Sequence, residues 1–428
     1  MRPRTPASVR STTIPTNGGH TIMTTIIDAP QQTTTQAAPD VAQKWVEVAR
    51  SLAPLVESER RQGDEDTVVT TKLVQAWRQA GLYRLLQPSH HGGEGLDNVS
   101  YLRVAEEVSR QDASAGWVFG IHIIGTLFPG ILLPADSYRE LVGSDGGGTA
   151  CGFAFGKIPG TAKPVDGGYL VQSEPMPFGS GTQRVDRVAS ALYLLDENGD
   201  NVLDEAGNPV VVNAYMDPEN IEWLNNWQAA GLRGSGSGHY RVKEHVLESK
   251  WLSNAPGERP SGAIFATGFF PLVHMHHTGV ALGVAKRAIE EIAKIAKGRR
   301  RGDIASLDEH PVFQHEFIRV DAEYRAARAL VFQAYREIWA AAEEGTVTEV
   351  HSARVEQADL HLHRVLREIV STVSVWAGSE AIPDGGVIAR LNADTSVAVN
   401  HLALSPHQSG KIAPHLLEAA RVESAPGS

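Results

Sequence analysis

The spacing of apolar residues changes twice along this chain, and these two changes limit the possible fold more than any other feature. Up to about residue 148 the apolar residues recur at helical spacing, as in the stretch 73–77. Between Thr149 and Trp251 they alternate or form β-branched runs, separated by turn sequences such as ENGD and EAGN. From Gly268 the helical spacing returns.

This order of patterns predicts an α+β fold in which a β domain lies between two helical domains. The predicted domains are an N-terminal helical domain (41–148), a central β domain (149–252) and a C-terminal four-helix bundle (268–417). The last helix of the bundle is expected over residues 392–417.

The first forty residues differ in composition from the rest. They are rich in Thr, Ser, Pro and Gln, and three arginines precede the first acidic residue, Asp28. This composition favours a disordered leader over residues 1–40, or a true translation start at Met23. A transit peptide is the alternative on composition, although no amphipathic apolar face is evident.

Composition excludes several classes of protein. The net charge is −11, and the sequence has no basic run with interleaved aromatic residues. Both features argue against binding to nucleic acid. Cys151 is the only cysteine, which fits a reducing, cytoplasmic setting and leaves no thiolate metal site. The longest apolar stretch, 118–133, is interrupted by His122, Gly125, Pro129 and Gly130, so no membrane span is expected.

A glycine-rich stretch, WQAAGLRGSGSGHY, occupies Trp227 to Tyr240 in the predicted β domain. Glycines let the backbone come close to a ligand, and free N–H groups beside Arg233 suit an anionic, planar or phosphate-bearing partner. The alternative is an ordinary tight turn.

Histidines are the other candidates for chemistry. His122 is the one strongly polar residue of an apolar helix, where a hydrogen-bonded core histidine is the alternative to a functional one. The cluster His274, His276 and His277 lacks a nearby acid, so pocket lining or surface is favoured over a metal site. We therefore predict no metal.

Five stretches in this order carry a family resemblance: GLYRLLQPSHHGGEGL, DASAGWVFGIHIIG, PMPFGSGTQRVD, WQAAGLRGSGS and RLNADTSVAVNH. From residue 42 to residue 417 the chain resembles the acyl-CoA dehydrogenase superfamily. More narrowly, it resembles the oxygenase components of two-component flavin-dependent monooxygenases, of which the 4-hydroxyphenylacetate hydroxylase oxygenase is the type.

The resemblance implies an enzyme that takes diffusible reduced FMN or FAD from a separate flavin reductase. Oxygen would add at flavin C4a, and the hydroperoxide would hydroxylate a small, phenolic or other aromatic substrate. It also implies a homotetramer. N- or S-oxygenation on the same fold remains open, as does an FAD-dependent acyl-CoA dehydrogenase. The region 390–414 has no glutamate to act as the dehydrogenase base, so that enzyme would need Glu290 or Glu291.

The resemblance also assigns site residues. His401 would lie at the flavin near the peroxide, Ser180 would hydrogen-bond the flavin edge near N5, and His122 would face the substrate as a base. The residues implied to bind the cofactor are Phe178, Ser180, Trp227, Arg233, Ser235, Ser237, Arg300 and Gln314. The residues implied to line the substrate pocket are Trp117, His122, His274 and His277.

Overall fold

The computed structural model describes residues 9–15, 21–27, 40–152, 158–297 and 306–423, in two units, Met1–Val41 and Ala42–Ser428. In the first unit, β1 (Val9–Pro15) pairs antiparallel with β2 (Thr21–Ile27). The disordered leader predicted for residues 1–40 falls largely on residues outside those described.

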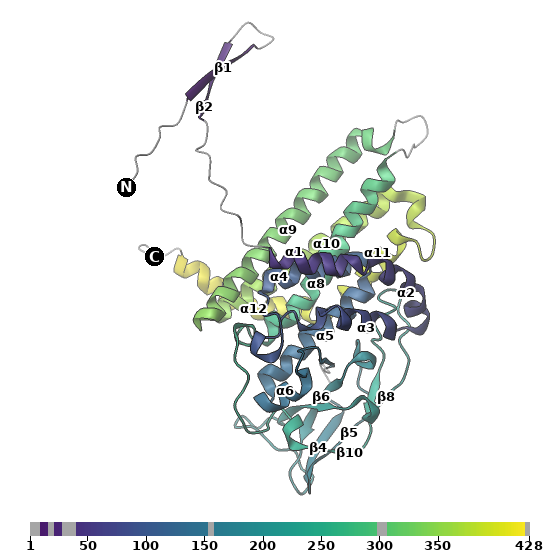
Figure 1. Ribbon diagram of the computed structural model, residues 1–428, viewed down its shortest axis with the longest axis vertical. Coiled ribbons are helices and arrows are strands. Elements are labelled where there is room, and N and C mark those ends of the chain that lie inside the picture. Colours follow the sequence, from purple (N-terminus) through teal and green to yellow (C-terminus); the bar gives the residue numbers. More distant parts are fainter. Residues whose placement is uncertain (1–8, 16–20, 28–39, 153–157, 298–305, 424–428) are drawn as a thin grey trace. The chain divides into compact units, whose positions relative to one another are not determined.

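The second unit begins with helices, as the apolar spacing predicts (Figure 1). The helices are α1 (Val41–Ser51), α2 (Ala53–Asp66), α3 (Thr71–Gln79), α4 (Asn98–Gln111), α5 (Ala113–Leu132) and α6 (Ala135–Val142), with the short 3-10 turns η1 (Leu82–Arg84) and η2 (Ser89–His91). The start of α5 is fixed by Asp112, whose side chain accepts a hydrogen bond from the backbone N–H of Ala115 (2.9 Å).

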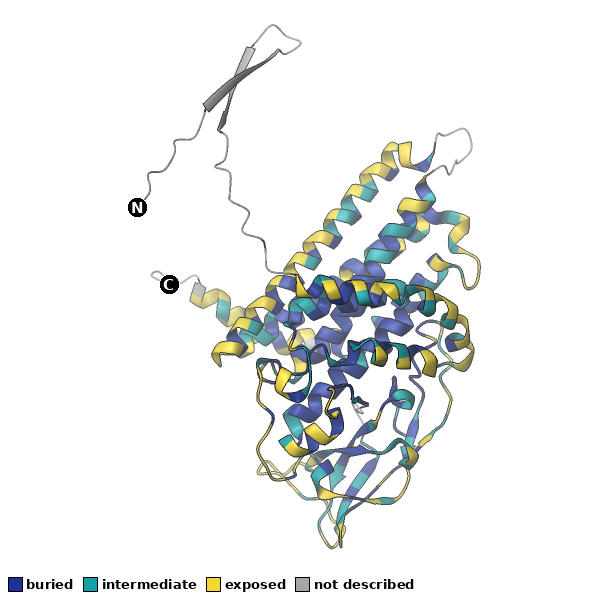
Figure 2. Ribbon diagram, viewed as in Figure 1, coloured by how far each residue is buried: buried dark blue, intermediate teal, exposed yellow. Residues whose placement is uncertain are grey.

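Helix α5 lies at the centre of this unit. It packs against α4, α8 and β3, and nearly all of it is buried (Figure 2). Residues Gly125 and Pro129 do not interrupt the apolar stretch, because both are accommodated inside α5, which has the length and composition of a membrane-spanning helix. Burial in the protein core accounts for its apolar composition.

The β domain follows, and its order within the chain confirms the predicted α+β fold. The strands are β3 (Ala150–Cys151), β4 (Gly160–Val165), β5 (Gly168–Ser173), β6 (Arg187–Leu194), β7 (Val211–Met216), β8 (Ile221–Trp223), β9 (Tyr240–Val242) and β10 (His245–Leu247). Six of them form a sheet in the order β10-β5-β4-β6-β3, with β7 paired antiparallel to β6. Strands β3 and β4 pair in parallel with opposite ends of β6, and β8 and β9 form a separate pair.

The C-terminal helices are α7 (Ala263–Ala266), α8 (Phe269–Ala296), α9 (Pro311–Glu344), α10 (Glu349–Ala377), α11 (Val387–Ala398) and α12 (Pro406–Glu423). Helix α8 packs against α10 on one side and against α4 and α5 on the other. The helix expected over 392–417 is wrong as one element, because α11 ends at Ala398 and a turn with the 3-10 segment η8 (Leu402–Leu404) precedes α12.

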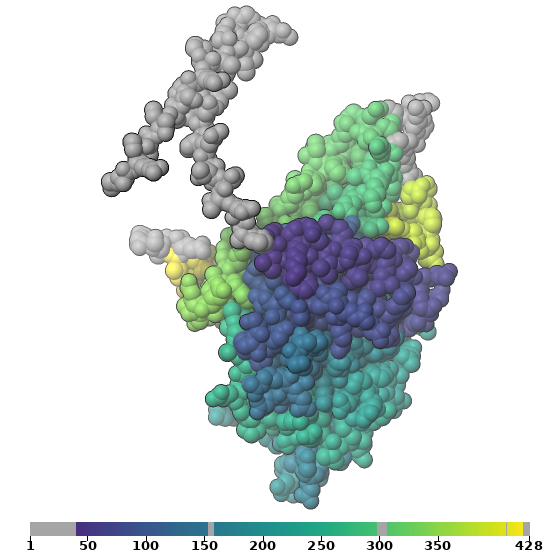
Figure 3. Space-filling view, in the orientation of Figure 1, coloured from purple at the N-terminus to yellow at the C-terminus, as the bar shows by residue number. Residues whose placement is uncertain are grey.

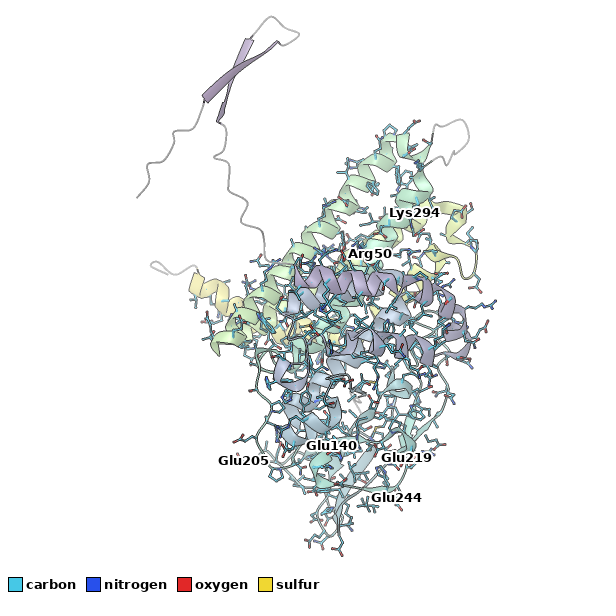
Figure 4. The ribbon with its side chains drawn as sticks, in the orientation of Figure 1. Arg50, Glu140, Glu205, Glu219, Glu244 and Lys294 are labelled. Carbon is cyan, nitrogen blue, oxygen red and sulfur yellow. The ribbon has the colours of Figure 1, made fainter. Side chains whose placement is uncertain are left out.

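In Figure 3 the N-terminal helices cover one face of the unit beside the β domain. Charged side chains gather at the periphery. Glu205, Glu219 and Glu244 lie at the outer edge of the β domain in Figure 4, and all three are exposed. The net negative charge of the chain therefore includes carboxylates that lie outside the central core.

Candidate functional site

A cavity of about 660 Å³ lies where α5, α8, the glycine-rich stretch and the turn between α11 and α12 come together. This volume is in the range of small-molecule and cofactor sites. The described residues that line it are Trp117, Ile121, Ile124, Phe128, Gly152, Phe178, Ser180, Trp227, Ala229, Leu232, Ser237, Val273, His276, His277, Val397, Asn400, His401, Leu402 and Ser405. Most are apolar or aromatic, so the cavity can exclude water from a reactive group.

Seven of the predicted site residues meet at this cavity, although they come from distant parts of the chain. They are Trp117, Phe178, Ser180, Trp227, Ser237, His277 and His401. On α5 the lining residues Trp117, Ile121, Ile124 and Phe128 recur at helical spacing, so one face of that helix forms a wall.

The turn after Pro177 presents Phe178 and Ser180 to the cavity. Phe178 has a positive φ of 60° and an exposed side chain (65 %), an unusual backbone conformation for an aromatic residue. Gly181 also has positive φ, and a Cβ there would lie 2.8 Å from His122 Nε2, so a larger residue would clash. The His122 side chain of α5 therefore packs closely against this turn.

Three serines join this turn to the glycine-rich stretch. Ser180 Oγ lies 2.6 Å from Ser237 Oγ, which lies 2.7 Å from Ser235 Oγ. Ser235 is fully buried and is not among the described lining residues, so it supports Ser237 from behind. Ser180 and Ser237 are therefore placed as a pair of hydroxyls that can bond a ligand edge.

The glycine-rich stretch is anchored from several sides. Trp227 Nε1 donates to the carbonyl oxygen of Leu232 (3.0 Å), and Leu232 N donates to Asp394 Oδ1 of α11 (2.7 Å). A Cβ on Gly231 would lie 2.1 Å from the carbonyl oxygen of Ala393, so glycine is required for this close approach. Arg233 is exposed and does not belong to the described cavity lining.

His401 lies in the turn that separates α11 from α12. Its Nδ1 accepts a hydrogen bond from the backbone N–H of Ala403 (3.2 Å), which caps η8 and leaves the proton of the neutral ring on Nε2. Burial, together with His274 and His363, lowers the pKa of His401 to about 4. The site thus holds a neutral imidazole whose N–H can donate a hydrogen bond.

The structure does not bring His122 to the cavity among the described lining residues. His122 Nε2 lies 2.9 Å from the carbonyl oxygen of Gly181, and its Nδ1 lies 3.0 Å from the hydroxyl of Tyr83. Nε2 must therefore donate and Nδ1 accept, so both nitrogens are occupied. Burial lowers the pKa of His122 to about 4. This geometry corrects the expected substrate-facing base to a core histidine that holds the Ser180–Gly181 turn.

His274 is also placed differently from the prediction. Its Nδ1 lies 2.7 Å from Asp359 Oδ2, and the two carboxylates of Asp359 and Glu356 raise its pKa to about 9 against the opposing effect of burial. Asp359 also pairs with His363, and burial of this assembly is complete. His274 is thus part of a buried ion pair behind the wall and does not line the described pocket.

Two other residues that the resemblance implies to bind the cofactor are not among the described lining residues. Arg300 lies outside the described residues. Gln314 is exposed on α9, where its Nε2 donates to the carbonyl oxygen of Asp308 (2.8 Å). Cofactor binding by Arg300 and Gln314 therefore stays a prediction.

The cavity also contains residues that the sequence interpretation missed, chiefly His276, Asn400 and Ser405. His276 shares a face of α8 with Val273 and His277, and this spacing of three and four residues was available in the sequence. Asn400 and Ser405 could not be placed, because they belong to the unexpected break between α11 and α12.

The residues present fit a planar heteroaromatic cofactor. On the β-domain side the wall consists of Phe178, Trp227 and Leu232 with the hydroxyls of Ser180 and Ser237. Flat apolar side chains suit the faces of a flavin ring, and paired hydroxyls suit its polar edge. Cys151 lies behind this wall, and burial raises the pKa of its thiol, so it is not a reactive thiolate.

Comparison with known proteins identifies the family of this chain. Residues 36–132 match the acyl-CoA dehydrogenase N-terminal domain, and residues 275–406 match the acyl-CoA dehydrogenase C-terminal domain. An indole-3-acetate monooxygenase of Acinetobacter baumannii is 28 % identical over 348 residues, which cover 79 % of this chain and 85 % of the relative.

The oxygenase component of p-hydroxyphenylacetate 3-hydroxylase from Acinetobacter baumannii is 22 % identical over 277 residues, which cover 61 % of this chain and 62 % of the relative. Among solved structures, XiaF from Streptomyces sp. in complex with FADH2 and glycerol superposes with a TM-score of 0.75 at 18 % identity, over 87 % of this chain and 94 % of that one. The last comparison shows a shared fold.

Proposed function

Because this chain belongs to the acyl-CoA dehydrogenase superfamily, as the oxygenase component of a two-component flavin-dependent monooxygenase, we propose that it hydroxylates a small aromatic substrate. The co-substrates are oxygen and reduced FMN or FAD, delivered by a separate flavin reductase. A phenol or an indole is the favoured substrate class, since relatives named for p-hydroxyphenylacetate and for indole-3-acetate both match the chain.

The observation that carries this proposal is the pair of chemically different walls around one cavity. The β-domain wall offers two hydroxyls between aromatic side chains, whereas the wall from α5 and α8 offers Trp117, Phe128 and two histidines. The first wall suits the cofactor and the second suits an aromatic substrate. A bound reduced flavin would supply the activation of oxygen.

The residues of this chain would hold and protect the reacting groups. Ser180 and Ser237 would hydrogen-bond the flavin edge, while Trp227 and Leu232 would pack on its faces. His401 would donate its Nε2–H to the oxygen that is transferred. The apolar lining keeps water away, which matters because water and stray protons would release hydrogen peroxide instead of product.

An acyl-CoA dehydrogenase would need a carboxylate at the cavity to remove a proton from the substrate. None of the described lining residues is Asp or Glu. Glu290 pairs with Arg110 (2.9 Å), and Glu291 pairs with Arg287 (2.8 Å) and with Lys294. Both candidate bases are thus bound in surface or inter-helix ion pairs. N-oxygenation and S-oxygenation on this fold remain as alternative products.

Stopped-flow absorbance tests the proposal directly. The protein is mixed anaerobically with reduced FMN or FADH2 and then with oxygenated buffer. We expect the appearance of oxidised flavin to be delayed relative to free flavin, and an aromatic substrate to yield a hydroxylated product that carries label from 18O2. Oxidation at the rate of free flavin, at every excess of protein, would overturn the proposal.

Three further expectations belong to the same proposal. The enzyme acts in the cytoplasm, it assembles as a homotetramer, and neither nucleic acid nor membrane is a partner. Light scattering of the purified protein measures the assembly. The protein is expected to be colourless as isolated, because the flavin diffuses in only when reduced.

A further inference from the structure

The cavity wall formed by α8 carries ring nitrogens for which the described residues provide no partner. Both nitrogens of His276 and Nδ1 of His277 are buried and make no hydrogen bond. Both side chains are at least 97 % buried, yet both line the cavity. A buried polar atom without a hydrogen-bond partner destabilises the folded protein, so unpaired nitrogens in a cavity wall point to a ligand.

The neighbouring charged groups do not use these nitrogens. Asp359 is bonded by His274 Nδ1 (2.7 Å), Thr278 Oγ1 (2.9 Å) and His363 Nδ1 (3.1 Å). Glu356 faces His274 at 3.6 Å. Asp359 is therefore occupied by His274, Thr278 and His363, and neither carboxylate of α10 bonds a nitrogen of His276 or Nδ1 of His277.

The surroundings of the two rings suit a flat ligand. A Cβ on Gly120 of α5 would lie 2.5 Å from His276 Nδ1, so this nitrogen faces α5 and the unpaired Nε2 is the one left for a ligand. The Trp117 ring meets His276 edge-on at 4.8 Å and His277 at 5.2 Å between centroids. Phe128 and Ile124 extend the same wall. An aromatic ring can pack here with one edge toward the histidines.

The charge state of the rings selects the type of ligand group. Burial, with a further contribution from His401, lowers the pKa of His276 to about 3 and that of His277 well below its usual value. Both imidazoles are neutral near pH 7, and each has one N–H and one lone pair. The carboxylates of Asp359 and Glu356 behind the wall disfavour an anion, whereas a neutral O–H or N–H group can donate to an imidazole lone pair.

We propose that His276 and His277 form a subsite for a protic group on the substrate ring, the O–H of a phenol or the N–H of an indole-type ring. The subsite deepens the proposed function, on which it rests. A ring group that donates a hydrogen bond to neutral imidazole gains electron density, which favours transfer of an electrophilic oxygen atom to that ring. This role replaces the one that the family resemblance implied for His122.

Matched ligand pairs test the subsite by calorimetry, both with the flavin-free protein and with the anaerobic complex with reduced flavin. The probes are phenol with anisole, and indole with 1-methylindole, in which a methyl group replaces the protic hydrogen. We expect methylation to weaken binding about tenfold in at least one pair. The pair that shows the loss identifies the ring class, and equal affinities within both pairs overturn the subsite.

A variant pair on one helix locates the effect. In His276→Phe the loss on methylation is expected to fall below about threefold, because the lone pair is gone. Val273→Ala, on the same face of α8, should weaken both members of a pair alike and keep their ratio. Should His276→Phe fail to fold, the wild-type pairs still decide.

The same samples separate this inference from the proposed function. If the protic ligand of a pair binds more tightly than its methylated partner but flavin oxidation is not delayed, the subsite is supported and the monooxygenase proposal for this cavity is overturned. If flavin oxidation is delayed but both ligands of each pair bind equally, the monooxygenase proposal is supported and the subsite is overturned.

Discussion

His401 combines two tasks that substitution can separate. Its Nδ1 caps η8 through Ala403, and its ring lies 4.2 Å from that of His277 at the cavity. Asparagine can cap the turn but offers no imidazole. We expect His401→Asn to keep thermal stability near wild type and to lower hydroxylation about a hundredfold. His401→Ala should in addition lose about 1 kcal/mol of stability.

Product formation per reduced flavin and thermal unfolding measure these two effects. The control is binding of reduced flavin, which both variants are expected to retain. Full hydroxylation by His401→Asn would show that the imidazole has no part in the reaction.

For His122 we expect substitution to lower stability, whereas for His401 we expect it to lower activity. Its partners, the Tyr83 hydroxyl and the Gly181 carbonyl oxygen, are buried with it. Removal of the ring in His122→Leu leaves both unpaired, which should cost about 2–4 kcal/mol of stability. Denaturant unfolding measures the loss. Since burial lowers the pKa of His122 to about 4, the pH dependence of the rate in the wild type should show no ionisation of this group between pH 6 and 8.

The contrast between His122 and His276 shows what could be predicted at the residue scale. The stripe Trp117, Ile121, Ile124 and Phe128 was readable from helical spacing, and His122 lies off that stripe, toward Tyr83. Helical spacing could not show which histidines find hydrogen-bond partners. Tyr83, the partner of His122, and Asp359, the partner of His274, lie far from those histidines in the sequence. Hydrogen-bond satisfaction is a tertiary property.

At the scale of elements, Asp394 ties α11 to the glycine-rich stretch. Its Oδ1 accepts the Leu232 N–H at 2.7 Å, while Arg390 of the same helix bonds Asp64 and Asp112. Burial, and to a lesser degree Asp112, raises the pKa of Asp394 to about 7. The raised value means that the folded protein prefers the protonated carboxyl. Its contribution to stability is therefore fully present below pH 4 and is lost as pH rises through 7.

Asp394→Asn keeps an acceptor oxygen for Leu232 and carries no charge. We expect the variant to match wild type near pH 4 to 5 and to be more stable by about 1–2 kcal/mol at pH 8. Urea unfolding at both pH values measures the difference. An equal loss of stability at both would mean that the negative charge itself supports the loop.

The pattern of apolar residues did not predict the break between α11 and α12. Apolar residues continue through 397–404, so periodicity favours an unbroken helix. The structure stops α11 at Ala398 and lets the His401 side chain cap the next turn, which brings Asn400 and Ser405 to the cavity. Pro406 at the first position of α12 was the available signal, since proline favours helix starts.

At the scale of the whole molecule, the order of domains was predictable because the hydrophobic period differs between helices and strands. No local sequence pattern indicates that α5, α8 and the glycine-rich stretch meet at one cavity. Only the family resemblance implied that residues of these segments share a site. The buried core is continuous between the helices and the sheet within residues 42–423. The boundary before residue 42 therefore separates the leader from everything that forms the site.

Two truncations test that boundary. Removal of residues 1–39 should leave the unfolding temperature and the binding of reduced flavin unchanged, because the cavity and the core lie in the second unit. Removal of residues 1–52 also deletes α1, whose Trp45 and Ala49 are buried and whose Arg50, labelled in Figure 4, pairs with Glu107 (3.2 Å). The loss of a core tryptophan typically costs about 3–5 kcal/mol, so the longer truncation should unfold at a markedly lower temperature. If the shorter truncation loses as much as the longer one, the leader takes part in the fold of the enzyme.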